Sequence, residues 1–136
     1  MLRPMGDSKS RSSAQRATPP RERTRFGRAI EERVGAALEA RGFIVLGRNQ
    51  RVGHDEVDVL ALDGTTLVLI EVRARANASC DEALASVNRK KVRFLKRAAL
   101  TLLASKEEQR EVRIDVVAVG TDRVEHLENA IDFSEP

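Results

Sequence analysis

The sequence predicts an α/β protein with one mixed sheet flanked by helices, in the element order α-β-β-β-α-β. A segment with helical periodicity comes first, three apolar strand-like runs follow, and a second helical segment separates them from a further apolar run. Strands joined by short turns pair antiparallel, whereas a helical crossover adds the next strand in parallel, so this order predicts a mixed sheet. The 136 residues are enough for one domain with a single core.

The first helix is predicted over residues 26–41. Ile30, Val34 and Leu38 recur at helical spacing, and Gly42 supplies a stop. The short apolar run "FIVLGRN" then predicts a strand, and "RVGHD" predicts a turn.

Two further strands follow as a hairpin. "EVDVLALD" alternates as a half-buried strand does, "DGTT" has hairpin turn chemistry, and "TLVLIEVRAR" is the most apolar run. Apolar residues at successive positions of that last run indicate cover on both faces and a central place in the sheet.

The second half predicts a crossover and a closing strand. "ANAS" breaks the chain, and one long helix is expected from about Asp81 to Ser105, with an interruption near Asn88. "VRIDVVAVG" predicts another buried strand, in which we interpret Asp115 as a structural acid. "VEHLENAID" predicts a last short strand or turn.

Composition excludes several classes of protein. The 41% apolar and 33% charged residues suit a globular chain, and no apolar run approaches the roughly 20 residues of a membrane helix. With no Trp or Tyr and four Phe, a base-stacking platform like those of single-strand-binding sheets is not expected. A single cysteine, Cys80, rules out an internal disulfide and a Cys-rich zinc site. We expect a cytoplasmic protein with Cys80 at its surface.

The positive charge is concentrated at the N-terminus. Residues 1–25 carry seven Lys or Arg and two acidic residues, whereas residues 26–136 carry 17 and 19. We therefore predict a disordered basic extension over residues 1–24 and a folded domain over residues 25–136. Nucleic-acid binding by that domain has to rest on local clusters of basic residues, because its net charge is close to neutral.

Two carboxylates on the predicted hairpin suggest a metal site. Asp58 and Glu71 lie on strands joined by a short turn, so they are expected to be neighbours. Like charges this close persist when a cation lies between them or when one is protonated. Oxygen ligands of this kind suit Mg²⁺ or Mn²⁺, which can promote phosphodiester hydrolysis. The alternative is that strand charges such as Glu71 and Arg73 simply pair with each other.

The predicted long helix carries a basic cluster. Arg89, Arg93 and Arg97 are four residues apart and share a helix face, and Lys90 and Lys96 flank it. Acidic partners are absent from this segment, so we predict contacts with the phosphate backbone of a nucleic acid. A solvated helix face is the alternative.

The segments "FGRAIEERVGAALEARGFIVLGRN", "DEVDVLALDGTTLVLIEVRAR", "ALASVNRKKVRFLKRAA", "RIDVVAV" and "VEHLENAID", in this order, resemble the YraN-like family (uncharacterised protein family 0102). The resemblance covers about residues 26–133. That family resembles the PD-(D/E)xK nucleases, which have a restriction-endonuclease-like core.

The resemblance implies a metal-dependent endonuclease acting on DNA, with branched or junction DNA among its candidate substrates. Asp58 and Glu71 match the motif acids, Glu31 matches a helical glutamate that often completes such sites, and Lys91 matches a family lysine. Glu56 also matches a family acid, although we favour an exposed strand-end charge. A homodimer is a further possibility, because cleaving a junction needs two sites.

The sequence departs from the family pattern at the motif lysine, which is Arg73, and at two glycines, which are Ile30 and Asp55. An arginine cannot give up a proton as a lysine with a lowered pKa can. Three hypotheses follow. Arg73 acts by charge alone, or Lys90 or Lys91 supplies the missing ammonium, or hydrolysis is lost and a non-catalytic nucleic-acid-binding module remains. His54 is a turn residue and a minor candidate for proton transfer. A third class of function is a structural or partner-binding protein whose charges only pair.

Overall fold

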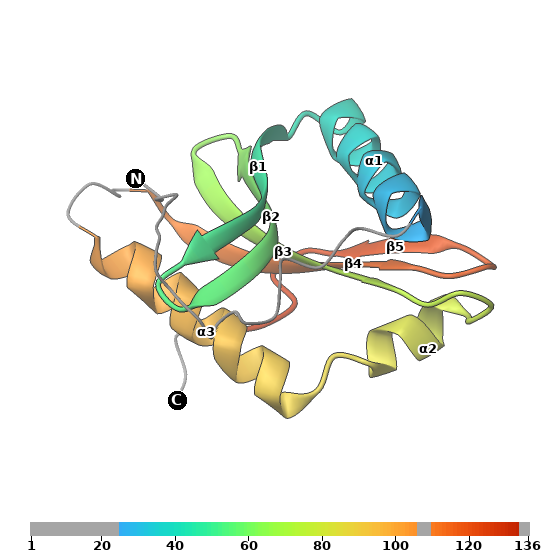
Figure 1. The fold of residues 1–136 in the computed structure, drawn as a ribbon. Coiled ribbons are helices and arrows are strands. Elements are labelled where there is room, and N and C mark those ends of the chain that lie inside the picture. Colours follow the sequence, from blue (N-terminus) through green and yellow to red (C-terminus); the bar gives the residue numbers. More distant parts are fainter. Residues whose placement is uncertain (1–24, 106–109, 134–136) are drawn as a thin grey trace.

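The structure, a computed structural model, describes residues 25–105 and 110–133 and places a mixed sheet between helices (Figure 1). The predicted extension over residues 1–24 lies outside the described residues, as do residues 106–109 and 134–136. The elements in chain order are helix α1 (Arg25–Ala40), strands β1 (Ile44–Val52), β2 (Asp55–Asp63) and β3 (Thr66–Ala74), helices α2 (Cys80–Ala85) and α3 (Arg89–Ala104), and strands β4 (Val112–Val119) and β5 (Val124–Leu127).

The sheet has five strands in the order β1-β2-β3-β4-β5. The first three strands form an antiparallel meander, β4 pairs with β3 in parallel, and β5 pairs with β4 antiparallel. The predicted mixed α/β sheet is confirmed, and the segment predicted as a last short strand or turn contains a fifth strand. No helix in the described residues is long and apolar enough to cross a membrane.

Each face of the sheet is covered by a helix, with α1 on one side and α3 on the other (Figure 1). Ile30, Val34 and Leu38 of α1 are buried against Val68 and Ile70 of β3. Leu95, Ala98 and Ala99 of α3 are buried against the opposite face, where the alternate β3 residues Leu67 and Leu69 point. The expectation that β3 is central and covered on both faces is confirmed.

The predicted long helix is two helices. Asn88 has an extended backbone, and its side chain accepts a hydrogen bond of 2.9 Å from Lys91 N–H, which makes it the N-cap of α3. The short helix α2 begins with a capping box between Ser79 and Glu82. The interruption near Asn88 is therefore a complete helix boundary.

Two other expectations from the sequence were wrong. The strand β1 continues to Val52, so only Gly53 and His54 form the turn that was predicted over residues 51–55. Cys80 is fully buried rather than on the surface, because the start of α2 packs against the end of β4. A side chain at Gly120 would overlap the backbone of Ser79 and Cys80, so this packing requires glycine there.

Candidate metal and phosphate site

A fork in the sheet brings the two predicted acids together. Strands β2 and β3 are paired from Asp63↔Thr66 to Val59↔Ile70. Beyond that point β2 stays paired with β1 as far as Asp55, while β3 stays paired with β4 as far as Ala74. Asp58 and Glu71 are the first residues past the point where β2 and β3 part, so the fork opens at these two carboxylates.

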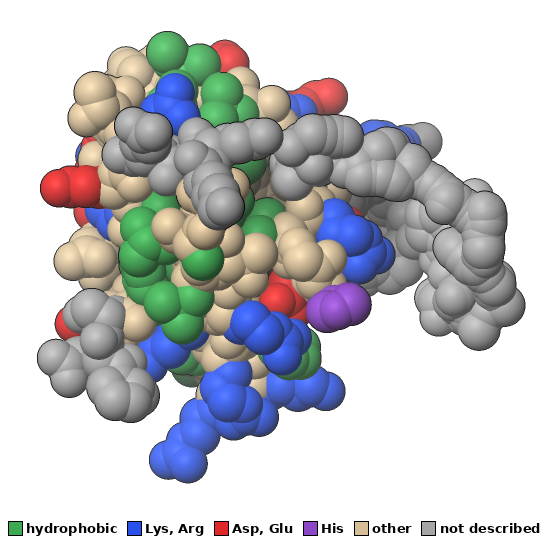
Figure 2. All heavy atoms as spheres, turned by 90° about the vertical axis from the view of Figure 1, so that its left-hand side faces the viewer, with side chains coloured by type: hydrophobic (Ala, Val, Ile, Leu, Met, Phe, Trp, Pro, Cys, Tyr) green, Lys and Arg blue, Asp and Glu red, His purple; other side chains and the backbone are tan. Residues whose placement is uncertain are grey.

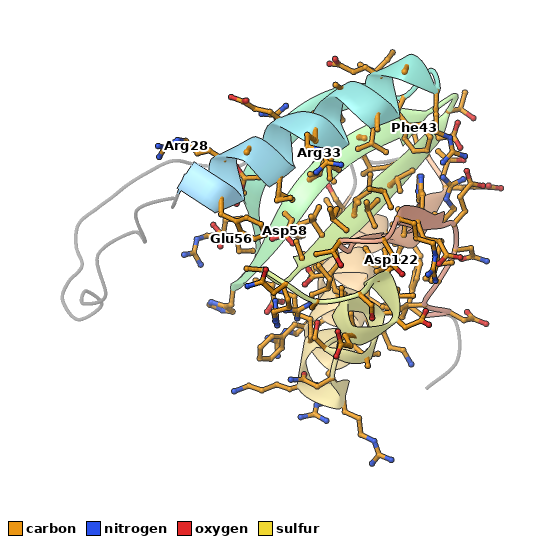
Figure 3. The ribbon with its side chains drawn as sticks, turned by 90° about the vertical axis from the view of Figure 1, so that its right-hand side faces the viewer. Arg28, Arg33, Phe43, Glu56, Asp58 and Asp122 are labelled. Atoms are coloured by element: carbon orange, nitrogen blue, oxygen red, sulfur yellow. The ribbon has the colours of Figure 1, made fainter. Side chains whose placement is uncertain are left out.

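Asp58 is fixed by the neighbouring strand. Its Oδ2 accepts a hydrogen bond of 2.9 Å from Val72 N–H, a backbone donor of β3. The side chain of Asp58 thus occupies the gap where the backbone pairing of the two strands has ended. Figure 3 shows Asp58 following Glu56 along β2 below α1. Glu56 is exposed, as we favoured from the sequence.

Glu71 is the buried member of the pair, with 2% of its surface exposed. Arg73 Nε lies 3.1 Å from Glu71 Oε2, and Lys91 Nζ lies 3.5 Å from Oε1. Neither contact completes the hydrogen bonding: within the described part of the chain, Glu71 Oε1 and Arg73 Nε are buried polar atoms without a hydrogen-bond partner. A buried carboxylate oxygen left in this state is costly unless a further ligand binds it.

The protonation of Glu71 reflects these surroundings. Burial and the nearby carboxylate of Asp58 raise the pKa of Glu71 to about 7, while Lys91 and Arg73 oppose that rise. The two cations therefore compensate only part of the cost of ionising Glu71. A divalent cation at the same oxygens would add positive charge where it is lacking, so the residues present fit Mg²⁺ or Mn²⁺.

The structure distinguishes the two lysines that were candidates to replace the motif lysine. Lys91, in the first turn of α3, contacts Glu71, whereas Lys90 Nζ lies 5.7 Å from the ring centroid of Phe94. The ammonium group at this site thus comes from α3, and the motif position on β3 supplies the guanidinium of Arg73.

Glu31 does not join the pair in a cluster of three. Among residues 25–105 and 110–133, no three His, Cys, Asp or Glu side chains lie close enough together to hold one metal ion. The helix α1 covers the face of the sheet opposite to the one from which Lys91 meets Glu71. Metal binding by Glu31 stays a prediction.

The basic cluster on α3 is exposed at its start. Arg89, Lys90 and Arg93 are exposed, and Lys96 is half-buried. In the lower part of Figure 2, Lys and Arg side chains (blue) gather on the surface, beside a histidine (purple) and an acidic side chain (red). Contact between this cluster and the phosphates of a nucleic acid stays a prediction.

Arg97 differs from the other basic residues, because its acidic partner comes from another element. Its Nε and Nη2 donate hydrogen bonds of 2.9 and 2.7 Å to the two oxygens of Asp55, which is buried at the start of β2. The hydrogen bond from Arg97 holds the pKa of Asp55 below its ordinary value. Arg97 is therefore paired, although the α3 segment itself contains no acidic residue. The ion pair between Arg97 and Asp55 joins α3 to β2.

Asp115, interpreted from the sequence as a structural acid, is fully buried and satisfied. It accepts hydrogen bonds from Arg113 Nε and Nη2 at 2.8 and 3.0 Å, from His126 Nε2 at 2.8 Å and from Asn129 N–H at 2.9 Å. Burial alone would raise the pKa of Asp115, but these hydrogen bonds outweigh it and hold the pKa below its ordinary value. The contacts of Asp115 are those of a structural residue.

A separate hollow of about 500 Å³ lies between α1 and strands β4 and β5. Its walls are mainly aliphatic, with Arg33, Arg41 and His126 at the lining. Asp58 and Glu71 do not line it. The candidate site is therefore the fork in the sheet, and this hollow is not part of it.

The fold and the fork define a mixed α/β protein with a carboxylate pair flanked by an arginine and a lysine. A model described as "Uncharacterised protein family UPF0102" matches residues 30–119. The chain belongs to this family, which confirms the resemblance drawn from the sequence.

Individual relatives agree with the family. A UPF0102 protein of Beutenbergia cavernae is 45% identical over 106 residues, which cover 73% of this chain and 90% of the relative. One from Cupriavidus metallidurans is 37% identical over 118 residues, covering 86% and 88%. One from Bordetella petrii is 42% identical over 120 residues, covering 84% and 72%.

Proposed function

We propose that this protein is a metal-dependent endonuclease that hydrolyses phosphodiester bonds in DNA, with branched DNA among its substrates. The observation that carries the proposal is the meeting of Asp58 and Glu71 at the fork, with a buried oxygen of Glu71 that lacks a hydrogen bond. The residues that would hold Mg²⁺ or Mn²⁺ are these two acids, with Glu31 as a predicted supporting ligand. When bound, the cation would activate the attacking water and offset charge on the phosphate.

The chain's own cations have separate roles in this proposal. Arg73 lies beside Glu71 and keeps its charge at every working pH, so it neutralises the scissile phosphate but takes no proton. Lys91 lies on the other side of Glu71 and can orient a water or contact the phosphate. The exposed residues Arg89, Lys90 and Arg93 would hold the backbone of the DNA without reading its sequence.

The test is cleavage of labelled duplex, forked and four-way DNA with Mg²⁺ or Mn²⁺. We expect Asp58→Asn and Glu71→Gln each to lower the rate by roughly a hundredfold or more. The matched control is Glu32→Gln, which removes the same charge from an exposed residue of α1 and should leave the rate unchanged. If the two site variants and wild type show equal traces of cleavage, the enzyme hypothesis is excluded.

A second candidate is a DNA-binding module of the same fold that does not cleave. It is favoured by one observation, namely that Arg73 and Lys91 already flank both oxygens of Glu71. It predicts binding that survives chelation of metal and weakens steeply with salt. Neutralising Arg89 and Arg93 should reduce the salt dependence, while DNA stays uncut with every cation.

A further inference from the structure

Phe94 is an apolar ring outside the cores of this protein. Among the described residues, none of the three hydrophobic clusters that fill the two faces of the sheet includes Phe94. By contrast, Phe43 is buried in the cluster under α1, and Phe133 packs against the cluster under α3. Core packing therefore does not explain why α3 carries an aromatic residue here.

The surroundings of Phe94 are cationic. Lys90 precedes it by four residues and places its ammonium 5.7 Å from the ring centroid. Arg97 follows it by three residues and places its guanidinium carbon 5.1 Å from the centroid. The ring thus lies between two cationic groups, of which Lys90 is the one available to a phosphate, on the helix face that carries the exposed basic residues.

Arg97 also fixes the ring relative to the sheet. Its guanidinium is held by both oxygens of Asp55 at the start of β2, so the side of Phe94 towards Arg97 rests on an anchored group. Lys90 is exposed, and within residues 25–105 and 110–133 no hydrogen bond or ion pair ties it to the sheet. A ligand can therefore displace Lys90 and reach the ring, while the ammonium moves to a neighbouring phosphate.

Phe94 also lies close to the acidic pair. It is three residues after Lys91, whose ammonium contacts Glu71, and residues three apart on a helix are neighbours about 5–6 Å apart at Cβ. A nucleotide whose base contacts Phe94 would therefore have its phosphates near Lys91 and the fork.

We infer that Phe94 is a stacking contact for one unpaired base of the DNA, next to the carboxylate pair at the fork. Phe94 is half-buried, so part of its ring is accessible at the surface. In duplex DNA the faces of the bases are covered by their neighbours, so such a ring can stack only where the strand is unpaired. A single ring suits one base and not the extended platform that the composition excludes. The inference rests on the proposed function and narrows its substrate to DNA with an unpaired nucleotide beside the cleavage point.

The experiment measures binding by fluorescence anisotropy in a metal-free buffer at fixed salt. The probes are a duplex with a short unpaired arm, the same DNA with abasic sites in that arm, and the fully paired duplex. The variants are Phe94→Leu, which keeps an apolar helix-forming residue, and Phe94→Tyr, which keeps a ring. The matched control is Phe26→Leu, at an exposed phenylalanine of α1 on the other face of the sheet.

Wild type should bind the arm with bases at least about fivefold more tightly than the abasic arm, because stacking on an aromatic side chain is worth ~1–3 kcal/mol. Phe94→Leu should lose that preference and bind the abasic arm and the duplex as wild type does. Phe94→Tyr and Phe26→Leu should keep it. This pattern is a double-mutant cycle between the ring and the base.

The inference is overturned if wild type binds both arms equally, or if Phe94→Leu loses affinity equally for both. The wild-type comparison decides the matter even if Phe94→Leu folds poorly. Because no metal is present, the result is separate from the proposed function: cleavage that depends on Asp58 and Glu71 can stand when stacking fails, and stacking can stand when cleavage is absent.

Discussion

Glu71 and Asp115 are both buried carboxylates on adjacent central strands, yet their surroundings are opposite. Asp115 accepts hydrogen bonds at both oxygens, whereas Glu71 Oε1 has no hydrogen-bond partner in the described residues. The pKa of Asp115 is held below its ordinary value, and the pKa of Glu71 is raised to about 7. Burial of a charge is therefore not itself a sign of function. What distinguishes a site is a buried charge whose hydrogen bonding is incomplete.

The difference has a simple structural origin. Asp115 is paired with Ile70 of β3 and lies one residue before the pairing of β4 with β5, which begins at Val116. The chain that follows β5 stays beside β4 there, since Ala130 N–H donates a hydrogen bond to the carbonyl oxygen of Ile114, and Arg113, His126 and Asn129 converge on Asp115. Glu71 lies where β3 has lost its pairing with β2. The segment that follows β5 encloses Asp115 and completes its hydrogen bonding, whereas the fork leaves room for a ligand at Glu71.

The largest effect on the free energy of unfolding is expected at Asp115, the carboxylate whose hydrogen bonding is complete. Asp115→Asn leaves Arg113 and His126 without their shared anion, so it should lower the free energy of unfolding by about 3–5 kcal/mol, as measured in urea. The control is Asp63→Asn, which removes the half-exposed second partner of Arg113 and should cost at most about 1 kcal/mol. Equal losses from the two variants would contradict the structural role of Asp115.

The next effect is a pH dependence of stability that Glu71 causes in metal-free buffer. Its pKa is about 7 in the folded protein against 4.5 as its ordinary value, so the folded state holds a proton more tightly than the unfolded state does. The contribution of Glu71 to the free energy of unfolding is fully present below pH 4.5 and is lost as the pH rises through about 7. The loss is at most about 3 kcal/mol.

Glu71→Gln checks this prediction, because it cannot ionise. The free energies of unfolding of wild type and variant should differ above pH 7, with the variant more stable, and the difference should shrink as the pH falls towards 4.5. Asp115 acts in the opposite direction: its stabilisation is present above its ordinary value of 3.8 and is lost as the pH falls below it. Parallel pH profiles for wild type and Glu71→Gln would refute the account of Glu71.

The smallest effect on stability is expected from Arg73→Lys. The substitution keeps the positive charge beside Glu71, so the free energy of unfolding should change by no more than about 1 kcal/mol. It restores the motif lysine, and we expect metal-dependent cleavage to become faster because a lysine can give up a proton. An unchanged rate, measured under the same conditions, would show that charge alone suffices at this position.

Much of the fold was predictable from local patterns. The periodicity of α1, the alternation in β2 and the apolar run of β3 predicted elements that the structure contains, and the short turn between β2 and β3 brought Asp58 and Glu71 together as expected. The sequence also indicated a break near Asn88. It did not indicate that Asn88 is the N-cap of a separate helix.

What the sequence could not show depends on contacts between distant elements. The pair between Asp55 and Arg97 joins residues 42 positions apart, and local charge counting misses it. Cys80 lies in a polar stretch, but it is buried because α2 packs on β4. Phe94 was overlooked, since an aromatic residue on a helix ordinarily packs in a core and only the structure shows that this one does not. The close approach at Gly120 likewise depends on packing alone.

The most direct test of the contrast between the two carboxylates is calorimetric titration of Mn²⁺ into the protein above pH 7, where Glu71 is ionised. We predict binding to wild type and to the control Glu32→Gln, with binding lost in both Asp58→Asn and Glu71→Gln. The same Mn²⁺ binding in all four proteins, or none in wild type, would contradict the claim that the fork is a cation site.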